Sequence, residues 1–168
     1  MLNLQHRIDL LIQLGKYIQD DGPDWQAVKS RASQANGWFT PGFIDLAAAN
    51  IAGRFLGEPD LKRIATKYQL PPETTHPATI GIVMAGNIPL VGFHDWLCVF
   101  LSGHIAMVKL SSRDNLLLPH LWGKLQEWAP DAGAHTQISE MLKGCDAYIA
   151  TGSDNSARYF EYYFKRFP

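Results

Sequence analysis

The residue best suited to take part in a reaction is Asn87. It is a lone amide in the segment Ala85-Gly86-Asn87-Ile88-Pro89, between two apolar runs. A carboxamide donates a hydrogen bond without titrating, so it can stabilise an oxyanion that develops during a reaction. The same side chain can instead close an Asx turn ahead of Pro89, which is a common local arrangement. The segment alone leaves both interpretations open.

A second polar segment lies at the end of the apolar run Ile105–Leu110 and just after it. Its members with binding potential are Lys109, Ser111, Ser112 and Arg113. A lysine and an arginine that flank two hydroxyls can hold a ribose or a phosphate. The alternative is a solvated loop in which Asp114 caps the following helix.

A third segment, Gly152-Ser153-Asp154-Asn155-Ser156, follows another apolar run and precedes a helical pattern. Unpaired N–H groups at the start of a helix favour an anion such as a phosphate. Helix capping by Ser153 or Asp154 is the alternative. The segment matches neither the dinucleotide fingerprint nor a P-loop.

Short apolar runs and longer helical patterns alternate in the second half of the chain and would position these three segments. Strands are expected over Thr79–Met84, Ile105–Leu110, Thr136–Ser139 and Ala147–Thr151, with helices over Leu90–Leu101, Leu116–Trp128 and Ala157–Phe167. The alternation predicts a parallel, doubly wound sheet. Ligands bind beyond the carboxyl ends of the strands in such sheets, which is where the polar segments fall.

The first 77 residues predict helices only. Apolar residues at helical spacing, separated by proline and glycine, indicate four of them: Leu4–Ile18, Trp25–Ala35, Pro41–Gly57 and Leu61–Tyr68. The expected fold class is therefore α/β, with a helical region at 1–77 and a partial Rossmann-like parallel sheet at 78–168. Few strands and the aromatic run Tyr159–Phe164 lead us to expect the front part of a longer protein.

Composition excludes several classes of function. A net charge of −1 with scattered lysines and arginines argues against nucleic acid as a partner. No apolar run can span a bilayer and no secretory signal is visible. Two cysteines make no disulfide framework, so a cytoplasmic location is expected. His94 and Cys98 are four apart on one expected helix, but two ligands without a third do not predict a metal site.

The ordered set of motifs resembles the aldehyde dehydrogenase superfamily. Within it, "GIVMAGNIPLVGFHDWLCVFLSGHIAMVKLSSRD" and "GCDAYIATGSDNSARYFEYYFKRFP" are similar to acyl-CoA reductases of the LuxC type, known from bacterial luminescence. The resemblance covers Thr79–Pro168 well, and "WFTPGFIDLA" fits the same group less specifically. It implies a reductase that converts a fatty acyl-CoA to an aldehyde through a cysteine thioester.

The resemblance also implies roles for individual residues. Asn87 would stabilise the oxyanion, and Lys109 would contact the adenosine ribose. NAD-using relatives carry an acidic residue at the position of Ser112. In this chain Ser112 and the following Arg113 would accommodate a 2′-phosphate, which a carboxylate would repel. NADPH is therefore the expected cofactor. Gly152 and Ser153 would face the pyrophosphate and nicotinamide. Ala157 replaces the second glycine of that family motif, which leaves the detailed cofactor pose open.

The nucleophilic cysteine of the family lies downstream of its T-G-S helix, and neither Cys98 nor Cys145 matches that position. The chain alone is therefore expected to be inactive, and to need the remainder of the same polypeptide or a homo-oligomer. Three alternatives stay open: another reductase of the superfamily, a non-catalytic nucleotide- or CoA-binding module, and a subunit that supports a partner through the aromatic segment Tyr159–Phe167.

Overall fold

The computed structural model describes residues 2–151 and 162 of the 168. In chain order its elements are α1 Leu4–Asp20, α2 Pro23–Ala35, α3 Pro41–Arg54, α4 Glu58–Lys67, β1 Thr79–Val83, α5 Phe93–Ser102, β2 Ile105–Lys109, α6 Leu117–Trp128, the 3-10 helix η1 Pro130–His135, β3 Thr136–Ile138 and β4 Ala147–Ala150. The α/β class is confirmed: a helical N-terminal region precedes a parallel sheet.

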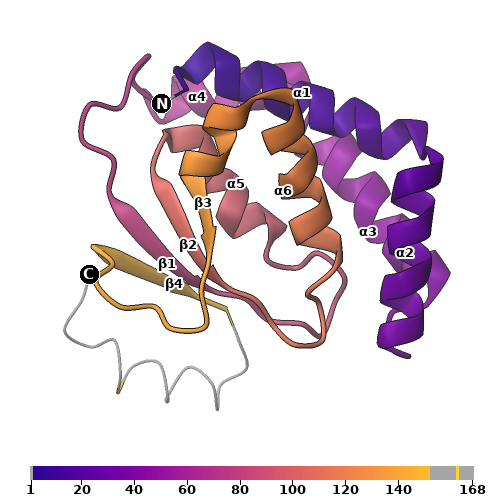
Figure 1. Cartoon of the computed structure of the whole chain (residues 1–168). Coiled ribbons are helices and arrows are strands. Elements are labelled where there is room, and N and C mark those ends of the chain that lie inside the picture. The colour runs from indigo at the N-terminus through magenta and orange to yellow at the C-terminus, as the bar shows by residue number, and fades with distance from the viewer. Residues whose placement is uncertain (1, 152–161, 163–168) are drawn as a thin grey trace.

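The sheet has the order β3-β2-β1-β4, and every strand pair is parallel. The chain builds outward from β1 through β2 to β3, and then returns to the other side of β1 to form β4. Helices α5 and α6 lie on the same side of the sheet, and α1 crosses beyond them (Figure 1). Alternate residues such as Ile82, Ala106 and Val108 are fully buried, whereas their strand neighbours are less so.

The helical region and the sheet share one hydrophobic core, because α1 packs on both α5 and α6. Trp25 and Trp96 are its largest fully buried side chains. Arg7 is also fully buried and connects the two regions: its Nε donates to the Leu101 carbonyl at 3.1 Å, and its NH1 donates to the Leu2 carbonyl. The guanidinium thus lies at the carboxyl end of α5, where the helix dipole favours a cation.

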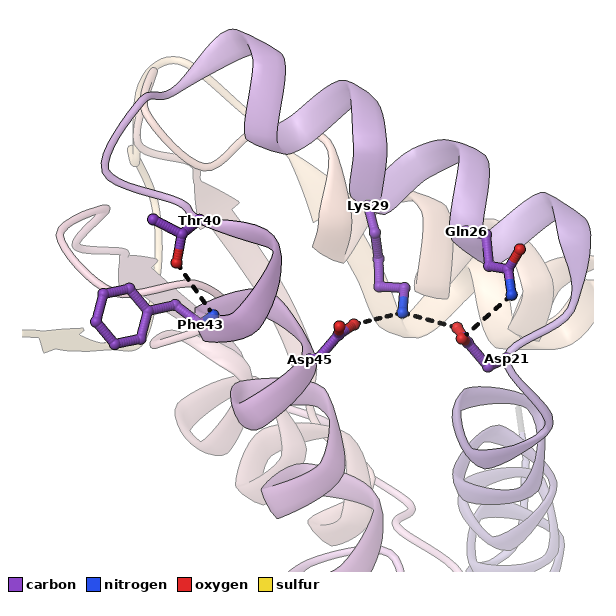
Figure 2. Close-up of polar contacts among 6 residues, drawn as sticks. All are labelled: Asp21, Gln26, Lys29, Thr40, Phe43 and Asp45. Carbon is purple, nitrogen blue, oxygen red and sulfur yellow. Dashed lines mark hydrogen bonds and ion pairs between the residues drawn. The ribbon is translucent and has the colours of Figure 1, made fainter.

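The first three helices are held together at one end by Lys29 of α2 (Figure 2). Its ammonium pairs with Asp21, directly after α1, at 2.8 Å and with Asp45 of α3 at 2.5 Å. This lysine lowers the pKa of Asp21 through a hydrogen bond. Thr40 caps α3, since its hydroxyl accepts from the Phe43 N–H at 3.3 Å.

Some predicted helix boundaries were wrong. Helix α5 begins at Phe93, three residues after the expected Leu90, because Leu90 has a φ of +60° in the preceding turn. Helix α3 ends at Arg54, short of Gly57, and α2 begins at Pro23 with Gly22 as an N-cap that supplies no side-chain bond. Across residues 2–151, no helix combines the length and apolar character needed to cross a membrane.

Candidate functional site

The candidate site lies at the carboxyl edge of the sheet, where β1, β2 and β4 end next to one another. Asn87 follows β1, Lys109 is the last residue of β2, and Thr151 follows β4. The crossing of the chain from β3 to β4 places the topological switch point between β1 and β4. In open α/β sheets this is the position of the ligand crevice.

Two of the predicted polar segments are in direct contact. Gly86 lies against Ser111: a Cβ at Gly86 would come within 2.2 Å of the Ser111 Oγ and 3.1 Å of the Arg113 Cβ. The Ser111 Oγ also accepts a hydrogen bond from the Arg113 backbone N–H at 3.2 Å. Only a glycine at position 86 permits this approach, so the residue before Asn87 fixes how the loops after β1 and β2 meet.

The buried side chain of Asp114 connects the same two loops. Its Oδ2 accepts from the Leu90 N–H at 2.7 Å, which holds Leu90 in its left-handed conformation. The other oxygen is buried with no hydrogen-bond partner in the described part of the chain. Burial raises the pKa of this carboxyl to about 6, against the effect of the Leu90 hydrogen bond, which lowers it. The expected alternative role was wrong: Asp114 does not cap α6, whose N-cap Leu116 supplies no side-chain bond.

The side chains predicted to meet a ligand face solvent. Asn87, Lys109, Ser112 and Arg113 are exposed, whereas Ser111 is half-buried between the loops. Within residues 2–151 the Asn87 amide makes no hydrogen bond, so no Asx turn forms through its side chain. Over the same residues, neither Lys109 nor Arg113 has a carboxylate partner. Among the residues that the structure describes, the edge therefore presents two cations without a carboxylate partner, an amide and a hydroxyl.

Two contacts at this edge were not anticipated. The Asn36 Nδ2, at the end of α2, donates to the Arg113 carbonyl at 3.1 Å and so ties the helical region to the loop after β2. The Thr151 hydroxyl donates to the Asp95 carboxylate of α5 at 2.9 Å, across the β1–β4 switch point. The sequence offered only the helix-ending pair Asn36-Gly37 as a signal for the first contact, and none for the second.

Gly152 and Ser153, predicted to bind the cofactor, lie outside the described residues, as does the expected helix Ala157–Phe167 apart from Tyr162. Cys145 is buried and precedes β4, at the opposite end of the sheet from Asn87. Cys98 is exposed on α5. Burial raises the pKa of both thiols, and Asp95 adds to this effect at Cys98.

No cluster of three or more histidine, cysteine or acidic side chains suited to a metal occurs among the residues that the structure describes. The chain matches no family model. A comparison with curated proteins likewise returned no match.

Proposed function

We propose that this chain is the N-terminal part of an NADPH-dependent acyl-CoA reductase of the aldehyde dehydrogenase superfamily. In this proposal the carboxyl edge of the sheet binds the adenosine end of the cofactor, and Asn87 stabilises the oxyanion of an acyl thioester. The proposal assigns the nucleophile to a cysteine beyond these 168 residues, because neither Cys98 nor Cys145 matches its position in the family. The acyl-CoA substrate, a cytoplasmic location and assembly as a homo-oligomer are parts of the same proposal.

One observation carries the proposal: the two polar loops after β1 and β2 meet at the edge that contains the switch point. Parallel strand order brings Asn87 and Lys109 to this edge, and the contact of Gly86 with Ser111 sets the distance between their loops. Binding at a crevice of this kind is a general property of open α/β sheets. The fold supports nucleotide binding on these grounds, while the reaction itself is inferred from the motifs.

The charge pattern fits NADPH better than NADH. Arg113 and Lys109 are exposed and lack carboxylate partners within residues 2–151. The only acidic side chain of that loop, Asp114, is buried and turned to the Leu90 N–H. No exposed carboxylate in the loop would therefore repel a 2′-phosphate, and a guanidinium pairs well with one. When bound, NADPH supplies a hydride.

The Asn87 side chain is available to bind a ligand. Its amide is exposed and is not engaged by any described residue. A donor of this kind stabilises a developing oxyanion by about 3 kcal/mol when it is held in place. We therefore expect Asn87→Ala in the complete enzyme to lower kcat by about 10² to 10³, with little change in the Kd for NADPH.

Cofactor binding can be tested on this chain by titration calorimetry with NADPH and with NADH. We expect Arg113→Ala to weaken NADPH binding by about 10- to 100-fold, the effect of losing a charge-assisted hydrogen bond, and to change NADH binding little. Arg54→Ala is the matched control, because Arg54 is exposed at the end of α3 and belongs to none of the loops that follow the strands. Equal losses for the two cofactors would refute contact with the 2′-phosphate, and absence of NADPH binding would refute the site.

A non-catalytic nucleotide-binding module is the second candidate. It is favoured by the placement of the cysteines, since Cys145 lies at the far end of the sheet and Cys98 on α5, both with raised pKa values. This candidate shares the predicted NADPH binding but predicts no dependence of any turnover on Asn87. Assay of wild-type and Asn87→Ala full-length gene product with acyl-CoA separates the two.

A further inference from the structure

An apolar groove of about 690 Å³ lies between α4 and α5. Its walls include Ile64 and Tyr68 from α4 and Leu97 and Leu101 from α5, and Phe55 contributes from the end of α3. Cavities that bind small organic molecules have volumes of about 300–1,000 Å³ and are mainly apolar with a few polar groups. This groove, which we call the α4–α5 groove, has that size and character.

The groove arises from how the two helices are packed. Both α4 and α5 pack on α1. Helix α4 turns Leu61 and Ala65 into the common core, which leaves Ile64 and Tyr68 on an adjacent stripe. Tyr68 is 65 % exposed, an unusual exposure for a large aromatic side chain. The α4–α5 groove thus presents apolar surface that the described residues do not cover.

The basic side chains at the rim of the groove favour a negatively charged ligand. Arg63 and Lys67, four residues apart on α4, both line it, and no carboxylate of residues 2–151 does. Arg63 pairs with Asp60 at 2.6 Å, outside the lining. The Lys67 ammonium lies 5.5 Å from the centroid of the Tyr68 ring and has no ion pair within residues 2–151. A negatively charged head group would therefore find an unpaired cation above an apolar floor.

The other polar groups in the groove do not indicate covalent chemistry. The Cys98 Sγ lies 3.9 Å from the His94 Nε2, but burial and the nearby Asp95 raise the pKa of the thiol. The thiolate, which is the nucleophilic form, is thus disfavoured. His94 is in ring contact with Phe55 at 5.3 Å and forms part of the wall.

We propose that the α4–α5 groove binds a fatty carboxylate, with the alkyl chain along α5 and the carboxylate at Lys67 and Arg63. The occupant is a single-chain anionic amphiphile, because the surface combines an apolar floor with Lys67, which is unpaired within residues 2–151, and with Arg63 beside it, which also pairs with Asp60. The groove shares no residue with the loops after β1 and β2. The proposal therefore does not depend on the nucleotide site.

Cys98 gives a direct readout, because the chain has one exposed and one buried cysteine. The experiment follows alkylation of each thiol by iodoacetamide, resolved by peptide mass, with and without decanoate below its micelle concentration. Decanoate at about ten times its Kd should slow alkylation of Cys98 roughly tenfold, because only the unbound fraction reacts. Alkylation of Cys145 should not change, which excludes a general stabilisation of the fold.

Two charge variants test the rim. Lys67→Glu should remove most of the protection by decanoate, whereas Lys62→Glu should retain it. Lys62 is on the same helix and undergoes the same change of charge, but it pairs with Glu58 and does not line the groove. Ile64→Trp, which fills the groove without altering charge, should also abolish protection, and thermal unfolding of each variant confirms that it folds.

Three results would overturn the proposal. Decanoate could fail to protect Cys98 in the wild-type chain. Decyltrimethylammonium could protect as well as decanoate, which would show an apolar groove without selection for an anion. Cys98 alkylation without ligand could slow as the protein concentration rises, which would assign the groove to a second copy of the chain.

Discussion

Replacing Asp114 with asparagine removes a buried carboxylate from between the loops after β1 and β2 and keeps an oxygen for the Leu90 N–H. The wild-type carboxyl has a pKa of about 6 in the folded chain, raised by burial from its ordinary value of 3.8. A difference of about two pKa units corresponds to about 3 kcal/mol of penalty on the folded state once the carboxyl is ionised.

The sign of the pH dependence follows from proton binding. Below the pKa that Asp114 has in the unfolded chain, its carboxyl is protonated in both states. The stability that the chain has with a protonated Asp114 is then fully present. As the pH rises through the folded pKa of about 6, this contribution is lost, because the folded chain binds the proton more tightly than the unfolded chain. Between about pH 4.5 and pH 7.5 the wild-type chain should lose about 2 kcal/mol relative to Asp114→Asn.

Urea unfolding followed by tryptophan fluorescence measures this difference, since several tryptophans are buried in the core. The free energy of unfolding of both chains is determined at several pH values, and only the change in their difference is interpreted, because other carboxyls titrate alike in both. Asp20→Asn, at the exposed end of α1, is the control because it makes the same exchange outside the core. A difference between wild type and Asp114→Asn that does not vary with pH would refute the argument that burial raises the pKa of this carboxyl.

Three further predictions concern packing and charge. Gly86→Ala should lower the free energy of unfolding by about 1–3 kcal/mol through the clash with Ser111, and adding Ser111→Gly should restore part of it in urea melts; no restoration would place the clash elsewhere. Lys29→Met should lower the free energy of unfolding by about 1 kcal/mol. Because Lys29 lowers the pKa of Asp21, this difference from wild type should vanish as the pH falls through the pKa of that carboxyl. A difference that persists in acid would contradict an electrostatic origin. Arg7→Ala should destabilise the chain by about 3 kcal/mol, since two carbonyls lose their donor, and a thermal midpoint equal to that of wild type would show that water replaces the guanidinium.

The parallel sheet could be predicted from the sequence because its determinants are local. Runs such as Thr79–Met84 are short, apolar and rich in β-branched residues. The runs at Thr79–Met84 and Ile105–Leu110 are each followed by a helical pattern that is long enough for a crossover. Parallel topology then places the ends of successive strands at one edge. This is why the loops that contain Asn87 and Lys109 could be assigned to one site before their contact was known.

The details of that site depend on contacts between residues far apart in the chain. Asp114 carries the signature of a helix cap, yet it binds the Leu90 N–H, 24 residues earlier. Asn36 carries the signature of a helix end, yet its amide reaches Arg113, 77 residues away. Local propensity favours the nearer partner in both cases, and tertiary packing supplies a better one.

The strand order also has a consequence for how the sheet assembles. Pairing of β1 with β2 closes a short loop, as in the contact between Ala78 and His104, 26 residues apart, whereas pairing of β1 with β4 brings together Thr79 and Asp146, 67 residues apart. The longer closure costs about 0.8 kcal/mol more chain entropy. We therefore expect β1, α5 and β2 to fold first and β4 to join late, so that backbone amides of β4 exchange with deuterium sooner than those of β2. The crevice between β1 and β4 would then be the last part of the sheet to form and the first to open.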